Sequence, residues 1–122
     1  PGVLAGAMRY HGVAPIVSSL YREKYVEAVA HGQIESYSAG LMFTRSEGIV
    51  LSPHAMYTVK EVIEQALRSK AAGTDDTILF TVTPAVSTET SPYDSLLDGV
   101  MHDEELQEES LKKSLGRFIG RG

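Results

Sequence analysis

The sequence predicts an α/β fold, in which helices cover a sheet, and three observations support this. Residues 53–73 carry apolar side chains at helical spacing behind a Ser–Pro start. Residues 77–82, TILFTV, follow and form a β-branched, apolar run typical of a buried strand. The composition, 43% hydrophobic and 22% charged over 122 residues, is that of a globular domain. A helix leading into a buried strand is the usual unit of layered α/β domains.

The pattern of residues 14–48 predicts two helices with a strand between them. Pro15 suits the first position of a helix, where its missing N–H costs nothing, and the apolar spacing behind it predicts an amphipathic helix over residues 14–24. Alternation of apolar and polar residues predicts a short strand at 25–30. A second helical stripe runs from Ile34 to Gly48, where the glycine predicts the end of the helix.

The helix over residues 53–73 has the clearest sequence signals, and a loop and a further helix are predicted after it. It begins after Pro53, ends at Gly73, and places its apolar residues on one face, namely Met56, Val59, Ile63, Ala66 and Leu67. A Ser/Thr/Pro-rich loop covers 84–92, and 104–118 is predicted as a helix whose acids precede its bases, as the helix dipole favours. Two strands make a poor sheet, so we expect these helices to cover a sheet encoded elsewhere.

Composition and charge exclude several classes of protein. The net charge of −5 without a long basic patch argues against nucleic acid as a partner. The absence of cysteine excludes disulfides and thiolate metal sites. No apolar run approaches 18 residues, so we expect no membrane segment and a cytoplasmic protein. The chain begins with proline rather than methionine, which suggests a cut, processed or partial protein.

A few polar residues are candidates for chemistry, each with an ordinary alternative. Glu47 is either a helix-terminal acid or a carboxylate in a cleft. Thr81 and Thr83 end the predicted strand, where ligands of open α/β sheets gather, or they are simply β-branched strand residues. The histidines show no metal-ligand spacing, so we expect surface or core residues at His11, His31, His54 and His102.

Several motifs in order carry a family resemblance. LAGAMRYHGVAPIVSSLY (4–21), VEAVAHGQIESYSAGLMFTRSEGIV (26–50) and TILFTV (77–82) together resemble the C-terminal part of tryptophan synthase β chains. The arginine followed by Tyr-His-Gly, and the later YDSLLDG and EESLKKSL, are similar to the second, stand-alone-type subfamily. The resemblance implies that the chain begins inside a longer protein.

The resemblance also implies a fold, a cofactor and a site. The family consists of pyridoxal 5′-phosphate enzymes of fold type II, which join indole to a dehydrated L-serine. The resemblance implies a three-layer α/β fold whose sheet would be incomplete in this chain. Glu47 matches the cofactor-facing glutamate of the EGI motif, as the catalytic residue. Thr83 matches the residue whose hydroxyl meets the pyridine nitrogen, and Arg9 the substrate-facing arginine. Tyr10 and Gly12 match a loop whose backbone carbonyls bind a monovalent cation.

The sequence also departs from the family. Residues 84–86, Pro-Ala-Val, replace Gly-His-Gly, and 52–57 lack a glutamate and a histidine of the family pattern. No residue matches the Schiff-base lysine or the glycine-rich phosphate loop, so we expect the polypeptide alone to be inactive.

These observations leave several functional hypotheses open. The first is the C-terminal segment of a β-like enzyme, with an active-site part over 1–86 and a loop and helices over 87–122. The alternatives are a divergent paralogue, a non-catalytic binding or assembly module, and a separate chain that completes another subunit's site. The expected partners are the remainder of a β-like chain, in a homodimeric parent, or a second copy of this chain through its uncovered apolar faces.

Overall fold

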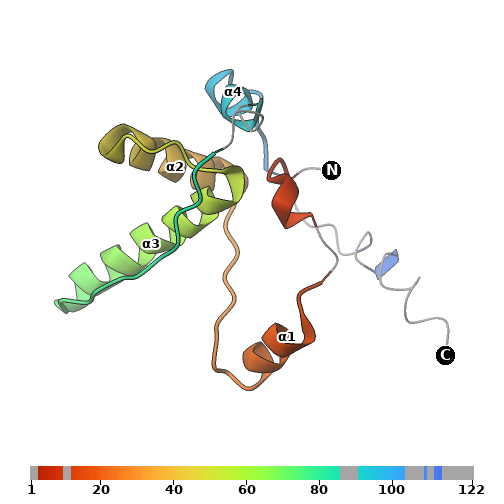
Figure 1. Cartoon of the computed structure of the whole chain (residues 1–122), viewed down its shortest axis with the longest axis vertical. Helices are drawn as coiled ribbons and strands as arrows, with labels where there is room; N and C mark the ends of the chain where they lie inside the picture. The colour runs from red at the N-terminus through yellow and green to blue at the C-terminus, as the bar shows by residue number, and fades with distance from the viewer. Residues whose placement is uncertain (1–2, 10–11, 86–90, 104–108, 110–111, 114–122) are drawn as a thin grey trace.

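The computed structural model describes residues 3–9, 12–85, 91–103, 109 and 112–113, and its regular elements are helices (Figure 1). In chain order these are η1 (Gly6–Met8), α1 (Pro15–Arg22), α2 (Gln33–Glu47), α3 (Pro53–Ala72) and α4 (Ser91–Leu97). The helices predicted at 14–24, 34–48 and 53–73 are therefore confirmed. The helix predicted over 104–118 lies outside the described residues, apart from positions 109, 112 and 113.

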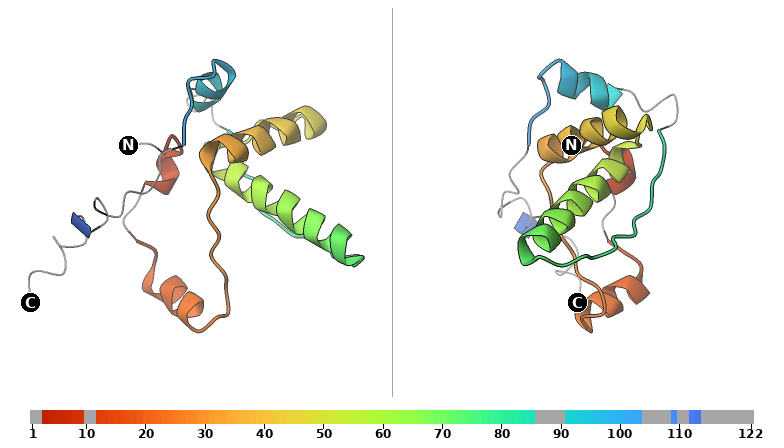
Figure 2. Two further views of the ribbon diagram at one scale, coloured as in Figure 1. Left: turned by 180° about the vertical axis from the view of Figure 1, so that it is seen from behind. Right: turned by 90° about the vertical axis from the view of Figure 1, so that its left-hand side faces the viewer.

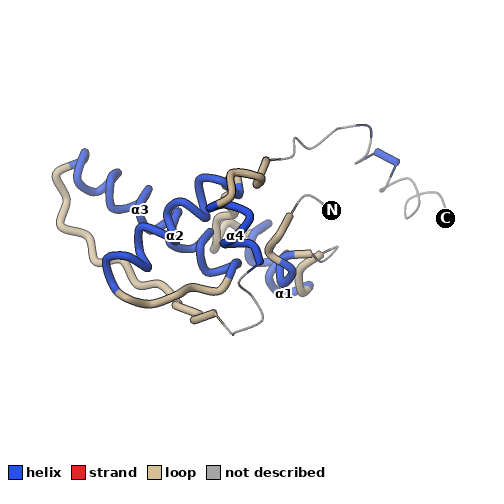
Figure 3. The backbone as a smooth tube through the Cα atoms, turned by 90° about the horizontal axis from the view of Figure 1, so that it is seen from above, coloured by secondary structure: helices blue, strands red, loops and turns tan. Residues whose placement is uncertain are grey.

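Neither of the two predicted strands is formed, and the described residues contain no sheet (Figure 3). Segments 25–30 and 77–82 are loops, and the β-type pairing in the described part of the chain is a single antiparallel bridge between Leu51 and Pro84. A strand exists only through hydrogen bonds to a neighbouring strand. Neither segment has a neighbouring strand among the described residues. Side chains of these two segments face solvent: Tyr25 is 79% exposed and Leu79 is 96% exposed.

The core lies between α2 and α3, with α4 packed at one end of the pair (Figures 1 and 2). Tyr37 of α2 is fully buried, and its ring meets those of Tyr57 and Tyr93 edge-on, with centroids 6.4 and 6.3 Å apart. The hydroxyl of Tyr93 donates to the carbonyl of Leu51, which is also fully buried. The Tyr37–Tyr93 pair thus holds α4 against α2, and the hydrogen bond of Tyr93 holds α4 against the chain between α2 and α3.

Large apolar faces stay uncovered by the described residues. Helix α1 buries none of its side chains, and Ile16 is 71% exposed. Figure 2 shows α1 lying away from the α2–α3 pair, at the end of an extended segment. The predicted apolar face of α3 is covered in its first half, where Val59 is buried, and uncovered in its second half, where Leu67 is exposed. In the described part of the chain, no helix combines the length and the apolar character needed to cross a membrane.

Candidate functional site

Glu47 is the last residue of α2, and its side chain is exposed. Gly48 follows in the left-handed conformation, with φ of +72°, and its N–H donates to the carbonyl of Thr44 at 2.9 Å. A carboxylate at this end of a helix faces the negative pole of the helix dipole, which is unfavourable. Glu47 therefore contributes little to the stability of α2, and a role toward a ligand is open to it.

The chain that follows Glu47 lies antiparallel to the chain around Thr83. The N–H of Ser52 donates to the carbonyl of Thr83 at 2.8 Å, and the N–H of Ala85 donates to the carbonyl of Val50 at 2.8 Å. The Thr83 side chain is exposed, and its hydroxyl has no hydrogen-bond partner among the described residues. The structure thus pairs residues 50–52, which follow Glu47, with residues 83–85, and it leaves the side chains of Glu47 and Thr83 exposed.

The Arg9 loop is the least enclosed of the predicted site segments. The Nε of Arg9 donates to the carbonyl of Val3 at 2.6 Å, and within the described part of the chain the guanidinium has no carboxylate partner. Gly12 is exposed, and Tyr10 lies outside the described residues. The described residues also hold no cluster of three or more His, Cys, Asp or Glu that could bind a metal ion. The substrate and cation roles of this loop remain predictions.

Ser52 and His54 form a pair at the start of α3 that the sequence analysis did not foresee. Ser52 occupies the predicted N-cap position, but its hydroxyl makes no cap and lies 3.2 Å from Nε2 of His54. The other ring nitrogen, Nδ1, is buried and has no hydrogen-bond partner among the described residues. His54 is a first-turn helix residue, as predicted, and the Ser-x-His spacing was the signal for this contact.

A cavity of about 600 Å³ lies where four separate stretches of the chain meet. They are the segment around η1, residues 29–33, the middle of α3, and Asp103. Its apolar lining consists of Val3, Met8, Val29 and Ala30. Neither Glu47 nor Thr83 lines it. A second hollow of about 480 Å³ separates α3 from residues 78–81 and includes Thr81 in its lining.

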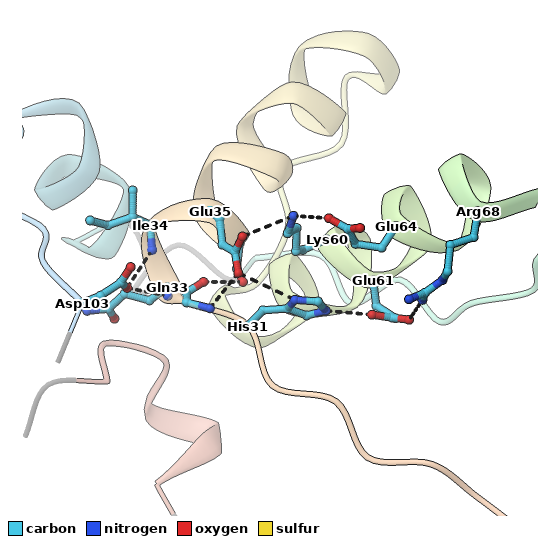
Figure 4. Close-up of polar contacts among 11 residues, drawn as sticks. His31, Gln33, Ile34, Glu35, Lys60, Glu61, Glu64, Arg68 and Asp103 are labelled. Carbon is cyan, nitrogen blue, oxygen red and sulfur yellow. Dashed lines mark hydrogen bonds and ion pairs between the residues drawn. The ribbon is translucent and has the colours of Figure 1, made fainter. Parts of the chain in front are cut away.

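His31 contacts a carboxylate of α3 and a carboxylate of α2 (Figure 4). Its Nε2 lies 2.8 Å from a carboxylate oxygen of Glu61, and its Nδ1 lies 3.7 Å from Glu35. The second oxygen of Glu61 accepts hydrogen bonds from Arg68 at 2.6 Å and Gln65 at 2.7 Å. The hydrogen bond from His31 is the largest cause of a lowered pKa of Glu61. Both Glu61 oxygens are therefore already engaged.

Lys60 forms a second set of contacts between α2 and α3 (Figure 4). Its ammonium lies 3.2 Å from Glu35 and also contacts Glu64, and chiefly the Glu64 contact raises the pKa of Lys60. Glu35 accepts the N–H of Gly32 at 2.9 Å, and this hydrogen bond, followed by Lys60, lowers the pKa of Glu35. These charges compensate one another, so the group has a structural role.

Gln33 and Asp103 tie three distant parts of the chain together. One oxygen of Asp103, Oδ1, accepts the N–H groups of Gln33 at 2.7 Å and Ile34 at 3.1 Å, which caps α2 from 70 residues away. The Gln33 amide donates to the carbonyl of His102 and accepts the N–H of Leu4 at 3.2 Å. Sequence reasoning missed this arrangement because no local pattern announces a cap supplied from so far along the chain.

Comparison with known proteins identifies what the chain is similar to. It is 40% identical over 99 residues to tryptophan synthase beta chain 2 of Aquifex aeolicus, which is 81% of this chain and 23% of that protein. It is 37% identical over 108 residues to tryptophan synthase beta chain of Thermococcus onnurineus, 88% of this chain and 24% of that one. With beta chain 2 of Methanosarcina acetivorans the identity is 38% over 99 residues, with shares of 81% and 22%.

These matches confirm the resemblance read from the motifs. The chain matches the C-terminal part of tryptophan synthase beta chains and spans about a quarter of their length. No family model matches the chain. No solved structure matches it either.

Proposed function

We propose that this chain is the C-terminal portion of a cytoplasmic, pyridoxal-phosphate-dependent tryptophan synthase β-like lyase that forms L-tryptophan from L-serine and indole. The observation that carries the proposal is the similarity to tryptophan synthase beta chains, at 37–40% identity over 81–88% of the chain. The pairing of the segments after Glu47 and around Thr83 supports it, because both residues are assigned to the same cofactor.

Thr83 fits the role of a hydrogen-bonding partner for the pyridine nitrogen of the cofactor. Its carbonyl is fixed by the N–H of Ser52, and its hydroxyl is exposed and unpartnered within the described part of the chain. A neutral hydroxyl holds the ring in place without giving it a proton. Pyridoxal phosphate, when bound, supplies the electron sink for elimination and replacement at the β-carbon of serine.

Glu47 and Arg9 are assigned to the reacting side of the site. The Glu47 carboxylate is exposed at a sharp turn, so it can hold or move a proton next to the cofactor. The Arg9 guanidinium has no carboxylate partner among the described residues, so it is free to bind the carboxylate of an amino-acid substrate. The carbonyls of Tyr10 and Gly12 are proposed to hold a monovalent cation that orders this loop.

The partner we propose is the remainder of a β-like chain, within a homodimeric parent. Segments 25–30 and 77–82 would then gain neighbouring strands and join a three-layer sheet of fold type II. The exposed side chains of Ile16, Tyr25 and Leu79 are the surfaces that such a sheet would cover. Without that partner, the same surfaces favour self-association of the chain, because large apolar patches are rarely left bare.

Reconstitution tests the proposal directly. The chain is mixed with the unmatched, N-terminal part of the Aquifex aeolicus relative, pyridoxal phosphate, L-serine and indole, and L-tryptophan is measured. We expect turnover only when both polypeptides are present. Glu47→Gln and Thr83→Val should each lower turnover by about 100-fold or more, and Thr83→Ser should retain it.

The reconstitution needs two controls. Ser38→Ala alters an exposed side chain of α2, whose hydroxyl only returns to the carbonyl of Ile34, and should leave turnover unchanged. The relative's own C-terminal part serves as the positive control. If that part restores activity and this chain does not, the assignment of an active lyase is refuted.

A non-catalytic descendant of the family is the second candidate, and one contact favours it. Ala85, which stands where the family has a histidine between two glycines, donates its N–H to Val50, so this stretch serves chain pairing. A stable complex of the two polypeptides without turnover would support this candidate over the first.

A further inference from the structure

The lining of the cavity of about 600 Å³ includes four apolar residues. They are Val3, Met8, Val29 and Ala30, and Val3, Met8 and Val29 keep 41%, 39% and 58% of their surface exposed. Such surface gains free energy when a flat apolar group covers it. Clefts of several hundred Å³ with apolar walls and a few converging polar groups are the usual form of small-molecule sites.

The lining of the cavity also includes polar groups that have no partners among the described residues. Oδ1 of Asp103 caps α2, but its other oxygen, Oδ2, has no partner among the described residues. The hydroxyls of Tyr57 and Thr58 also have none there. Burial, and next the charge of Asp103, raise the pKa of Tyr57, so its phenol stays neutral and can accept or donate a hydrogen bond. A ligand in the cavity would find a free carboxylate oxygen and two hydroxyls.

The charged residues around the cavity determine which sign of charge a ligand can carry. Asp103 and Glu61 are carboxylates, and no lysine or arginine is among the described lining residues. Figure 4 shows Asp103 and Glu61 at opposite sides of His31, whose ring contacts two carboxylates. Arg68 balances the charge of Glu61, whereas Asp103 has no cationic partner among the described residues, so Asp103 repels an anionic ligand and attracts a cation.

We propose that this cavity binds an aromatic amine in its cationic form. The ring lies against the wall of Val3, Met8, Val29 and Ala30, and the ammonium group donates to the free oxygen of Asp103 and to the hydroxyl of Tyr57. Glu61 makes no direct contact with the ligand, because its oxygens are already engaged by His31, Arg68 and Gln65 and its charge is balanced by Arg68. The proposal does not depend on the lyase function.

Tryptamine is a suitable probe because the chain contains no tryptophan. Its indole fluorescence can be followed in the 122-residue chain with excitation beyond the tyrosine absorption, and anisotropy reports binding. Indole-3-acetate carries the same ring with the opposite charge. We expect tryptamine to bind at least about 10-fold more tightly than indole-3-acetate, because the Asp103 carboxylate attracts the ammonium group and repels the acetate group.

Two variants with equal loss of charge separate a specific site from general attraction. Asp103→Asn keeps a side-chain oxygen that caps α2 and removes the negative charge, so we expect about 10-fold weaker tryptamine binding with an unchanged unfolding midpoint. Asp75→Asn removes one charge from an exposed turn and should leave binding unchanged. Tyr57→Phe, which keeps the ring, should weaken binding by about 3-fold.

Three results of this experiment would each refute the proposal. They are equal binding of tryptamine and indole-3-acetate, no binding of either, and an equal effect of the Asp103 and Asp75 variants. If Asp103→Asn changes the unfolding midpoint, Tyr57→Phe decides in its place, and an unchanged affinity in that variant refutes the contact.

Discussion

Gly40 is the position where the packing of α2 against α3 is most sensitive to a single added methyl group. An ideal Cβ at Gly40 would lie 2.5 Å from Cγ, 2.9 Å from Sδ and 3.0 Å from Cβ of Met56. Met56 is fully buried. Carbon atoms in contact normally stay about 3.5–4.0 Å apart. Gly40→Ala therefore forces the two helices apart or drives Met56 out of its rotamer.

Two opposing effects set the magnitude. Alanine is a better helix former than glycine by about 1 kcal/mol. Overpacking a well-filled core costs about 1–3 kcal/mol, and the upper end applies because the Cβ of Met56 is fixed to the backbone of α3 and cannot rotate away. We expect Gly40→Ala to lower the free energy of unfolding by a net amount of about 1–2 kcal/mol.

Urea unfolding followed by far-UV circular dichroism measures this difference. Ser38→Ala, an exposed change in the same helix, should stay within about 0.5 kcal/mol of the wild type. In a Met56→Ala background the closer Cγ and Sδ atoms are gone and only the Cβ contact at 3.0 Å remains, so Gly40→Ala should cost less than in the wild type, with a coupling energy of about 1–2 kcal/mol. If Gly40→Ala stabilises the otherwise unaltered chain by the full helix-propensity gain, the close approach of the helices is refuted.

Three further predictions concern the helix ends and the His31 contacts. Gly48→Ala should cost about 1 kcal/mol because the φ of +72° strains any residue with a Cβ; thermal unfolding checks this, and Gly48→Asn should lose less. Asp103→Ala should cost about 1 kcal/mol by removing the cap of α2, whereas Asp103→Asn should retain most of the stability; equal losses would refute the cap. The pKa of Glu61 is lowered in the folded chain, so its carboxylate stabilises the fold above its unfolded pKa, and this contribution is lost as the pH falls through the folded value. Glu61→Gln should therefore flatten the acid side of the stability profile, between about pH 5 and pH 3, in an acid titration by circular dichroism; parallel curves would contradict the contact.

Sequence reasoning performed best where structure depends on neighbours along the chain. Pro15 and Pro53 occupy the first turns of α1 and α3, and the glycines at 48 and 73 end α2 and α3 in the left-handed conformation, as predicted. The family resemblance is likewise a property of motifs in order, and the comparisons confirm it.

It performed worst for the two strands. The β-branched run at 77–82 has the right composition, but its residues extend along α3 without strand partners (Figure 1), and Leu79 is almost fully exposed. Residues 25–30 behave in the same way. Composition makes a segment suitable for a strand, yet only a neighbouring strand makes it one.

The candidate site shows the same contrast between features read from local motifs and features that depend on tertiary structure. Glu47, Thr83 and Arg9 were assigned from matching motifs, and their roles stay predictions. The cavity and its surroundings were invisible in the sequence, because His31, Glu61 and Asp103 come from separate stretches that share no local pattern.

Helix positions and helix ends follow from the sequence because the hydrogen bonds and steric preferences behind them act over a few residues, and the resemblance to tryptophan synthase beta chains follows from the order of the motifs. The cap that Asp103 places on α2, the cavity, and the failure of two segments to become strands were decided by tertiary structure. Each of these depends on which groups distant in sequence meet in space, and a strand or a long-range cap has no satisfied hydrogen bonds until its partner arrives.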